Sequence, residues 1–201
     1  RGHKNRFGAV NEIGIFAMTD QGLREVPNPS AIFLQRVDFD ATGSVTTVTW
    51  EGTRSLLVEI QALADDSSSN QPRRIAVGLD HQRLSMQLAI MNRHCATSLS
   101  NQDVFINVVG GVRIQETGSD LALVLAVLSS LNNRPLPRDL VTFGEVGLTG
   151  ELRPVVNGQE RLREASKHGF KKAIVPFANQ PKDPVAGLSV YAVKHLSAAL
   201  E

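Results

Sequence analysis

Short runs of alternating apolar and polar residues fill much of the chain, which is the pattern of β-strands. Ser44–Trp50 alternates and is rich in β-branched residues, so it predicts a half-buried strand, and Leu56–Leu63 is a candidate for its hairpin partner. Similar shorter runs predict strands at Ile13–Met18, Ala31–Gln35, Arg74–Leu79, Val104–Val109, Val141–Val146, Ala173–Pro176 and Ser189–Val193.

Helices are predicted where apolar residues recur every three or four positions. Leu84, Leu88 and Met91 form one such face, and Asp80 can cap the start of that helix. Two other helical stretches are Gln159–His168, closed by Gly169, and Leu196–Leu200.

The stretch Leu121–Leu131 is almost wholly apolar, which indicates a buried central helix with Ser119 or Asp120 as its cap. The polar run Asp65–Gln71 predicts a mobile loop, and Leu148–Glu151 predicts a hairpin turn. Strands interleaved with helices predict a single domain of the α/β (α+β) class.

Composition narrows the function classes. The chain has 201 residues and a formal net charge of +1, so only local patches could attract nucleic acid or membrane. Cys95 is the only cysteine, which excludes an intramolecular disulfide and favours a reducing, cytoplasmic setting. No apolar run is long enough to span a bilayer. Because the chain opens with polar residues and no initiator Met, we expect a fragment of a longer protein.

Two stretches resemble known bacterial proteins. Lys4-Asn5-Arg6-Phe7-Gly8 is similar to the motif of the RadA (Sms) family of DNA repair ATPases. The segment 104–179 resembles the proteolytic domain of Lon, which RadA carries in modified form. Within it, Phe143–Pro154 is similar to the Lon stretch before the catalytic lysine, and Gly158–Leu162 and His168–Pro176 continue the similarity.

The resemblance implies a Lon-like fold with ribosomal-protein-like β-α-β topology. Residues 1–12 would be an arm from a missing ATPase core, and residues 13–201 the Lon-like domain. The parent protein would use ATP and Mg and hold Zn in a separate finger. This chain has neither a phosphate-binding loop nor a Cys-x-x-Cys, so we expect no cofactor here.

The resemblance also places Lon's catalytic serine on Gly118 and its lysine on Gln159. Glycine has no side chain, and an amide is not a base, so each change should cost on the order of a thousand-fold in rate. Ser119 is an alternative nucleophile or a simple helix cap. The next lysine, Lys167, is eight residues beyond Gln159, or about 12 Å along a helix, too far to serve as its base.

Basic residues suggest where DNA could bind. Lys4 or Arg6 of the arm could reach a phosphate. We favour a cluster with a single acid, Asp80, nearby in sequence, made of Arg73, Arg74, Arg83 and Arg93. A second cluster, mixed with Glu160 and Glu164, is made of Arg153, Arg161, Arg163, Lys167, Lys171 and Lys172.

The leading hypothesis is a non-catalytic Lon-like domain of a RadA-type branch-migration helicase. It would act as a hexamer scaffold and contact single-stranded and branched DNA, with RecA recombinase as a functional partner and no membrane. Two alternatives stay open. One is a cryptic serine peptidase that uses Ser119, and the other is an oligomerisation module without DNA contact.

Overall fold

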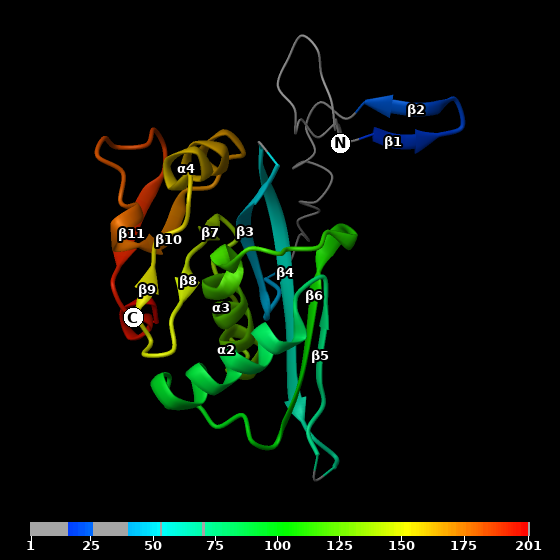
Figure 1. Ribbon diagram of the computed structural model, residues 1–201, viewed down its shortest axis with the longest axis vertical. Helices are drawn as coiled ribbons and strands as arrows, with labels where there is room; N and C mark the ends of the chain where they lie inside the picture. The colour runs from blue at the N-terminus through cyan, green and yellow to red at the C-terminus, as the bar shows by residue number, and fades with distance from the viewer. Residues whose placement is uncertain (1–15, 26–39, 53, 70, 201) are drawn as a thin grey trace.

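A computed structural model of the chain describes residues 16–25, 40–52, 54–69 and 71–200 (Figure 1). The strands are β1 (Phe16–Thr19), β2 (Gly22–Glu25), β3 (Ser44–Glu51), β4 (Arg54–Asp66), β5 (Arg74–Val77), β6 (Gln102–Val108), β7 (Leu140–Thr142), β8 (Glu145–Val146), β9 (Leu152–Arg153), β10 (Lys172–Pro176) and β11 (Ser189–Val193). The α-helices are α2 (His81–His94), α3 (Asp120–Leu131) and α4 (Gly158–Lys167).

Seven strands form one mixed sheet in the order β11-β10-β7-β3-β4-β6-β5. β4 is antiparallel to both of its neighbours, β3 and β6. The other neighbouring strands, β11–β10, β10–β7, β7–β3 and β6–β5, pair in parallel. Two small antiparallel pairs, β1–β2 and β8–β9, form separate two-stranded sheets. The fold is therefore a mixed α/β domain whose centre is the β3–β4 pair.

The sheet separates two apolar cores, because successive side chains of a strand point to opposite faces. Val45 of β3 lies in the larger core, under α2 and α3, and Val48 lies in the smaller core, under α4. In Figure 1, α2 and α3 lie on one side of β4, β6 and β5, while α4 lies near the β10–β11 end. On the face opposite α2 and α3, α4 packs on β3 and β4, so the part of that face farthest from a described helix is over β6 and β5.

Several predicted elements are confirmed. Ser44–Trp50 and Leu56–Leu63 do pair as a hairpin within β3 and β4. Asp80 caps α2, since its Oδ1 accepts a hydrogen bond from the backbone N–H of Arg83 at 2.8 Å. Helix α3 is buried from Asp120 to Ser129, as its composition predicts. Gly169 follows α4 with a φ of +82°.

Other predictions need correction. The run Val141–Val146 is two strands, because the chain turns at Gly144, whose φ is +153° and whose added Cβ would lie 2.7 Å from Pro176 Cγ. β4 continues through Asp66, so the polar run Asp65–Gln71 is in part strand rather than loop. Its polarity reflects an exposed strand end.

The N-terminal predictions are only partly covered. Strand β1 overlaps Ile13–Met18, and its partner β2 was not predicted. Ala31–Gln35 and the boundary between residues 12 and 13 lie outside the described residues.

Candidate functional site

The N-terminus of α3 is fastened to the turn after β7. Gly118, in the buried 3-10 turn Thr117–Ser119, uses its carbonyl oxygen to accept a hydrogen bond from Gly144 N–H at 2.8 Å. The Gly144 carbonyl in turn accepts from Leu121 N–H at 3.1 Å. This reciprocal pair fixes the helix start against the sheet, in the place where the resemblance puts a nucleophile.

The space beside Gly118 is occupied by an ion pair. A Cβ added at Gly118 would lie 3.3 Å from Arg161 Nη1 and 3.3 Å from Glu116 Oε1. Arg161 comes from α4 and is completely buried, and Glu116 comes from the segment just before Gly118. The α4 side chain that reaches this centre is thus Arg161 and not Gln159.

The guanidinium of Arg161 donates hydrogen bonds to a carboxylate and to two backbone carbonyls. Arg161 Nη1 and Nη2 donate to the two oxygens of Glu116 at 2.7 and 2.6 Å. Nη1 also donates to the Val48 carbonyl at 2.5 Å, and Nε donates to the Val156 carbonyl at 2.9 Å. Glu116 Oε1 also accepts from Trp50 N–H at 2.7 Å. The bidentate pair therefore joins α4, β3 and the start of α3.

Gln159 lies elsewhere. Its side chain is exposed and lines a shallow surface hollow of about 330 Å³ with Lys167, Pro181 and Asp183, which Gly118 does not line. Lys167 itself lies 3.8 Å from Glu164 on the same helix. The three atoms nearest to a Cβ added at Gly118 belong to Arg161 and Glu116, and none belongs to Gln159.

Ser119 and Asp120 are both buried, but neither caps α3 in the way the sequence suggested. Ser119 occupies the cap position and makes no side-chain capping bond. Asp120 is the first helical residue, and its carboxylate accepts hydrogen bonds from Arg83 Nε at 2.7 Å and from Val146 N–H at 3.1 Å. Burial raises the pKa of Asp120, and the bonds from Arg83 and Val146 oppose that rise.

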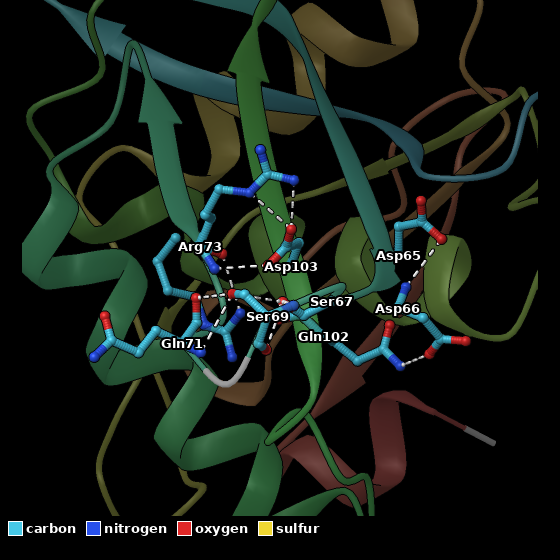
Figure 2. Close-up of polar contacts among 9 residues, drawn as sticks. Asp65, Asp66, Ser67, Ser69, Gln71, Arg73, Gln102 and Asp103 are labelled. Atoms are coloured by element: carbon cyan, nitrogen blue, oxygen red, sulfur yellow. Dashed lines mark hydrogen bonds and ion pairs between the residues drawn. The ribbon is translucent and has the colours of Figure 1, made fainter.

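Two members of the favoured basic cluster bind the end of the sheet. Arg73 pairs with Asp103, with Nε 2.8 Å from Oδ2 (Figure 2). Arg74 donates to the carbonyl oxygens of Gln102 and Leu99, and partial burial lowers its pKa. Asp103 is distant in sequence from both arginines, so the sequence could not show this neutralisation.

The other two members differ from each other. Arg83 forms an ion pair with the buried Asp120, whereas Arg93 is exposed at the end of α2 and has no ion pair among those found in the described part of the chain. Counting neighbours in space, the cluster holds Asp103 and Asp120 as well as Asp80. The assignment of DNA binding to Arg73, Arg74, Arg83 and Arg93 remains a prediction. Arg93 is the member freest to contact a phosphate, because it is exposed and has no ion pair among those found in the described residues.

Some predicted site residues cannot be placed. Lys4, Asn5, Arg6, Phe7 and Gly8 lie outside the described residues. Within the described ranges, no group of three or more His, Cys, Asp or Glu side chains could hold a metal ion. In the same ranges, no helix has the length and apolar character needed to cross a membrane.

Sequence reasoning missed Glu116 and placed Arg161 on a basic surface. A signal for Arg161 existed, because positions 158, 161, 162 and 165 recur at helical spacing and form the buried face of α4. No comparable signal marks Glu116, whose partners are 45 and 66 residues away in the chain.

Together these features define a mixed α/β domain with a seven-stranded sheet and a buried polar centre saturated by its own ion pairs. The chain belongs to the family described as subunit ChlI of Mg-chelatase, which matches residues 53–179.

Over its whole length the chain is also similar to bacterial proteins named DNA repair protein RadA. It is 64% identical to that of Salmonella typhimurium and 63% identical to that of Escherichia coli, each over 200 residues, and 44% identical to that of Bacillus subtilis over 205 residues. It covers 44% of each of these relatives, so it spans less than half of their length.

Proposed function

We propose that the chain is the non-proteolytic, Lon-like domain of a RadA-type DNA repair ATPase, and that it serves as a scaffold of a hexameric ring and as a contact for DNA. The full-length similarity to proteins named DNA repair protein RadA supports the repair role. The motifs around Gly118 and Gln159 support the Lon-like origin.

The observation that carries the non-proteolytic part is the Arg161–Glu116 pair beside Gly118. A serine–lysine mechanism needs a hydroxyl and a base that is neutral part of the time. A guanidinium stays protonated in proteins, so Arg161 cannot take a proton from a nucleophile. The Arg161–Glu116 pair consequently holds α4, β3 and the start of α3 together.

Restoring the missing groups tests this part. Gly118→Ser alone, and Gly118→Ser combined with Gln159→Lys, should leave casein undegraded, because the lysine would stand on an exposed surface while Arg161 stays beside the serine. Circular dichroism checks that each variant folds. Casein hydrolysis by the double variant would show that the two positions form a dyad.

The rival peptidase hypothesis rests on Ser119. A fluorophosphonate probe should not label the wild-type chain, since Ser119 is only 3% exposed. Labelling that disappears in Ser119→Ala would favour the peptidase over the scaffold.

DNA contact is tested by binding to single-stranded and branched DNA over a range of salt. Arg93→Ala should weaken binding and lower the salt slope by about one, as the loss of one phosphate contact does. The double variant Arg73→Ala, Arg74→Ala should also weaken DNA binding. It should in addition lower the free energy of unfolding, because both side chains bond to the end of the sheet, whereas Arg93→Ala should not. Arg54→Ala, an exposed residue on the β3–β4 turn, is the matched control.

The third hypothesis, an oligomerisation module without DNA contact, predicts assembly with no electrophoretic shift of DNA at low salt. The remaining parts of the proposal concern the whole protein. There, ATP, Mg and Zn would be bound outside this chain, RecA recombinase would be a functional partner, and the setting would be the cytoplasm.

A further inference from the structure

A small cavity lies between helix α2 and the β8–β9 hairpin. Its α2 wall is one face of the helix, made of Arg83, Met86, Gln87 and Ile90, and residues 145–149 form most of its hairpin wall. Figure 1 shows this hairpin reaching the C-terminal end of α2. The cavity has a volume of about 250 Å³, which is below the ~300–1,000 Å³ of sites for drug-sized ligands, so it suits a single side chain or a similarly small molecule.

Hydrogen bonds fix the hairpin wall against its neighbours. Gln87 Nε2 donates to the Val146 carbonyl at 3.4 Å, and the Val146 N–H donates to Asp120 Oδ2 of α3 at 3.1 Å. At the C-terminal end of α2, His94 Nε2 lies 3.2 Å from the Leu148 carbonyl oxygen. The shape of the cavity is therefore set by the fold, as it is in most ligand sites.

One side chain of the α2 wall has an unused acceptor. Gln87 is 1% exposed, and the Val146 carbonyl beside it can only accept, so the amide nitrogen of Gln87 must face that carbonyl. Its Oε1 atom is then left without a hydrogen-bond partner in the described part of the chain. Buried polar atoms are nearly always satisfied, so this oxygen calls for a donor from a ligand or a water.

One guanidinium serves two carboxylates beside this cavity. Arg83 Nε donates to Asp120 Oδ1 at 2.7 Å, and this bond, together with the charges of Asp120 and Glu145, raises the pKa of Arg83. Burial raises the pKa of Asp120, and the nearby charge of Glu145 raises it further. Glu145 itself accepts from the Thr117 hydroxyl at 2.5 Å and has no ion pair among those found in the described residues. Together, Arg83, Asp120 and Glu145 therefore carry one uncompensated negative charge.

The other lining groups do not supply the missing cation. Arg153 is paired with Glu151, with its Nε 2.9 Å from Oε1. Much of the remaining wall is apolar, since Ile90 is 3% exposed and Met86 and Leu148, at the rim, are 41% and 71% exposed. The cavity thus combines a carboxylate, an amide oxygen and a short apolar wall.

We propose that this cavity binds an alkylammonium group. The ammonium donates to the Glu145 carboxylate and to Gln87 Oε1, and the alkyl chain covers Met86 and Leu148. An ammonium donates in three directions, whereas a guanidinium donates in a planar fork that suits a single carboxylate, so two acceptors on separate elements favour the ammonium. A metal ion is disfavoured, because the described ranges hold no group of three His, Cys, Asp or Glu side chains that could bind it.

Two sources carry this chemistry, which are a lysine side chain of a protein and a free polyamine. Both present an ammonium on a flexible chain of methylene groups. The site is distinct from the proposed DNA contact, because its uncompensated carboxylate attracts a cation and repels a phosphate.

Methionine methyl groups report binding to the 201-residue chain by NMR. Met86 lines the cavity, whereas Met18 lies on β1 and Met91 is buried in the larger core. Butylammonium chloride is compared with butan-1-ol, which has the same carbon chain without the charge, and with sodium chloride at equal ionic strength. Butylammonium should shift the Met86 signal with millimolar affinity and leave the Met18 signal in place. Butan-1-ol should bind about ten-fold more weakly, and sodium chloride should not shift Met86.

Two variants test the acceptors. Glu145→Gln keeps an oxygen for the Thr117 hydroxyl but removes the charge, so it should weaken butylammonium binding by about ten-fold. Gln87→Leu removes the amide oxygen and should weaken binding by a few-fold. Glu160→Gln makes the same charge change at an exposed position of α4 and should bind like the wild type. Circular dichroism checks that each variant folds.

A glycine–lysine–glycine tripeptide with blocked ends and spermidine distinguish the two sources. A lysine source predicts that the tripeptide binds about ten-fold more tightly than butylammonium, and a polyamine source predicts this of spermidine. If neither does, the cavity takes adventitious cations only and the inference is wrong. It is also wrong if butan-1-ol binds as tightly as butylammonium, if folded Glu145→Gln binds like the wild type, or if the Met86 signal does not shift.

Discussion

A buried arginine is costly to desolvate, and Arg161 is tolerated because Glu116 and two backbone carbonyls satisfy it. The pair connects three elements that are far apart in sequence. Removal of the Arg161–Glu116 pair therefore affects the packing of α4 on the sheet as well as the ion pair itself.

Arg161→Met should lower the free energy of unfolding by about 3 kcal/mol or more, because Glu116 is left largely buried without its partner. Arg163→Met on the exposed side of α4 should change stability by no more than about 0.5 kcal/mol. Urea unfolding measures both. The double variant with Glu116→Gln should lose less than the sum of the single losses, and strict additivity would show that the two residues are uncoupled.

Glu151 provides a pH-dependent contribution at the β8–β9 turn. Hydrogen bonds from Thr149, followed by those from Arg153, lower the pKa of this carboxyl to about 2 from its ordinary value of 4.5. A lowered pKa means that the folded state favours the charged form. The stabilisation is therefore complete above about pH 4.5 and is lost as the pH falls towards 2.

Glu151→Gln should accordingly lose stability at pH 7 and show a shallower decline in stability between pH 4.5 and pH 2 than the wild type. Unfolding in urea at several pH values tests this. Titration of the Glu151 side-chain carbon by NMR gives a direct value, and a midpoint near 4.5 would contradict the assignment.

At the scale of elements, the turn between β7 and β8 depends on one glycine. Gly144 combines a left-handed φ of +153° with close approach to the Pro176 ring. Its N–H and C=O also hold the start of α3. The turn therefore sets the position of α3 relative to the sheet.

Gly144→Ala should destabilise the fold by about 1–3 kcal/mol through strain and overlap. Gly169→Ala is the comparison, because its φ is also positive at +82° but nothing lies within 4 Å of an added Cβ. The difference between their urea midpoints isolates the overlap with Pro176. Equal losses would mean that backbone strain alone matters.

The same turn shows where sequence reasoning succeeds and where it stops. Alternation located β3 and β4 and helical spacing located α2, because those patterns are local consequences of burial on one face. The break at Gly144 is set by Pro176, and the neutralisation of Arg73 is set by Asp103, both about 30 residues away. A one-dimensional pattern does not record such contacts.

At the scale of the molecule, the two cores share one sheet. β3 and β4 contribute Val45 and Ile60 to the larger core and Val48 and Leu57 to the smaller one. Neither core can lose its packing while the strands between them remain ordered. We therefore expect the seven-stranded domain to unfold as one cooperative unit.

Far-ultraviolet circular dichroism and Trp50 fluorescence should give coincident urea transitions. Trp50 is a suitable reporter because its backbone N–H donates to Glu116, the partner of the buried Arg161, and because it is the only tryptophan. Val48→Ala in the smaller core should shift both curves together. Separate midpoints would indicate that the α4 side unfolds independently.

The central place of β3 has a consequence for synthesis. β3 pairs with β4 on one side, but its other neighbour, β7, joins through Thr46 and Val141. A ribosome finishes β4 at Asp66 and must add about 75 more residues before β7 is complete, which takes on the order of 4–15 s at typical elongation rates. During that interval the nascent hairpin has an open inner edge, which is a template for pairing with other chains. The order of strands in the finished sheet thus makes the nascent chain dependent on protection from aggregation, by a chaperone or by dilution, until β7 has been synthesised.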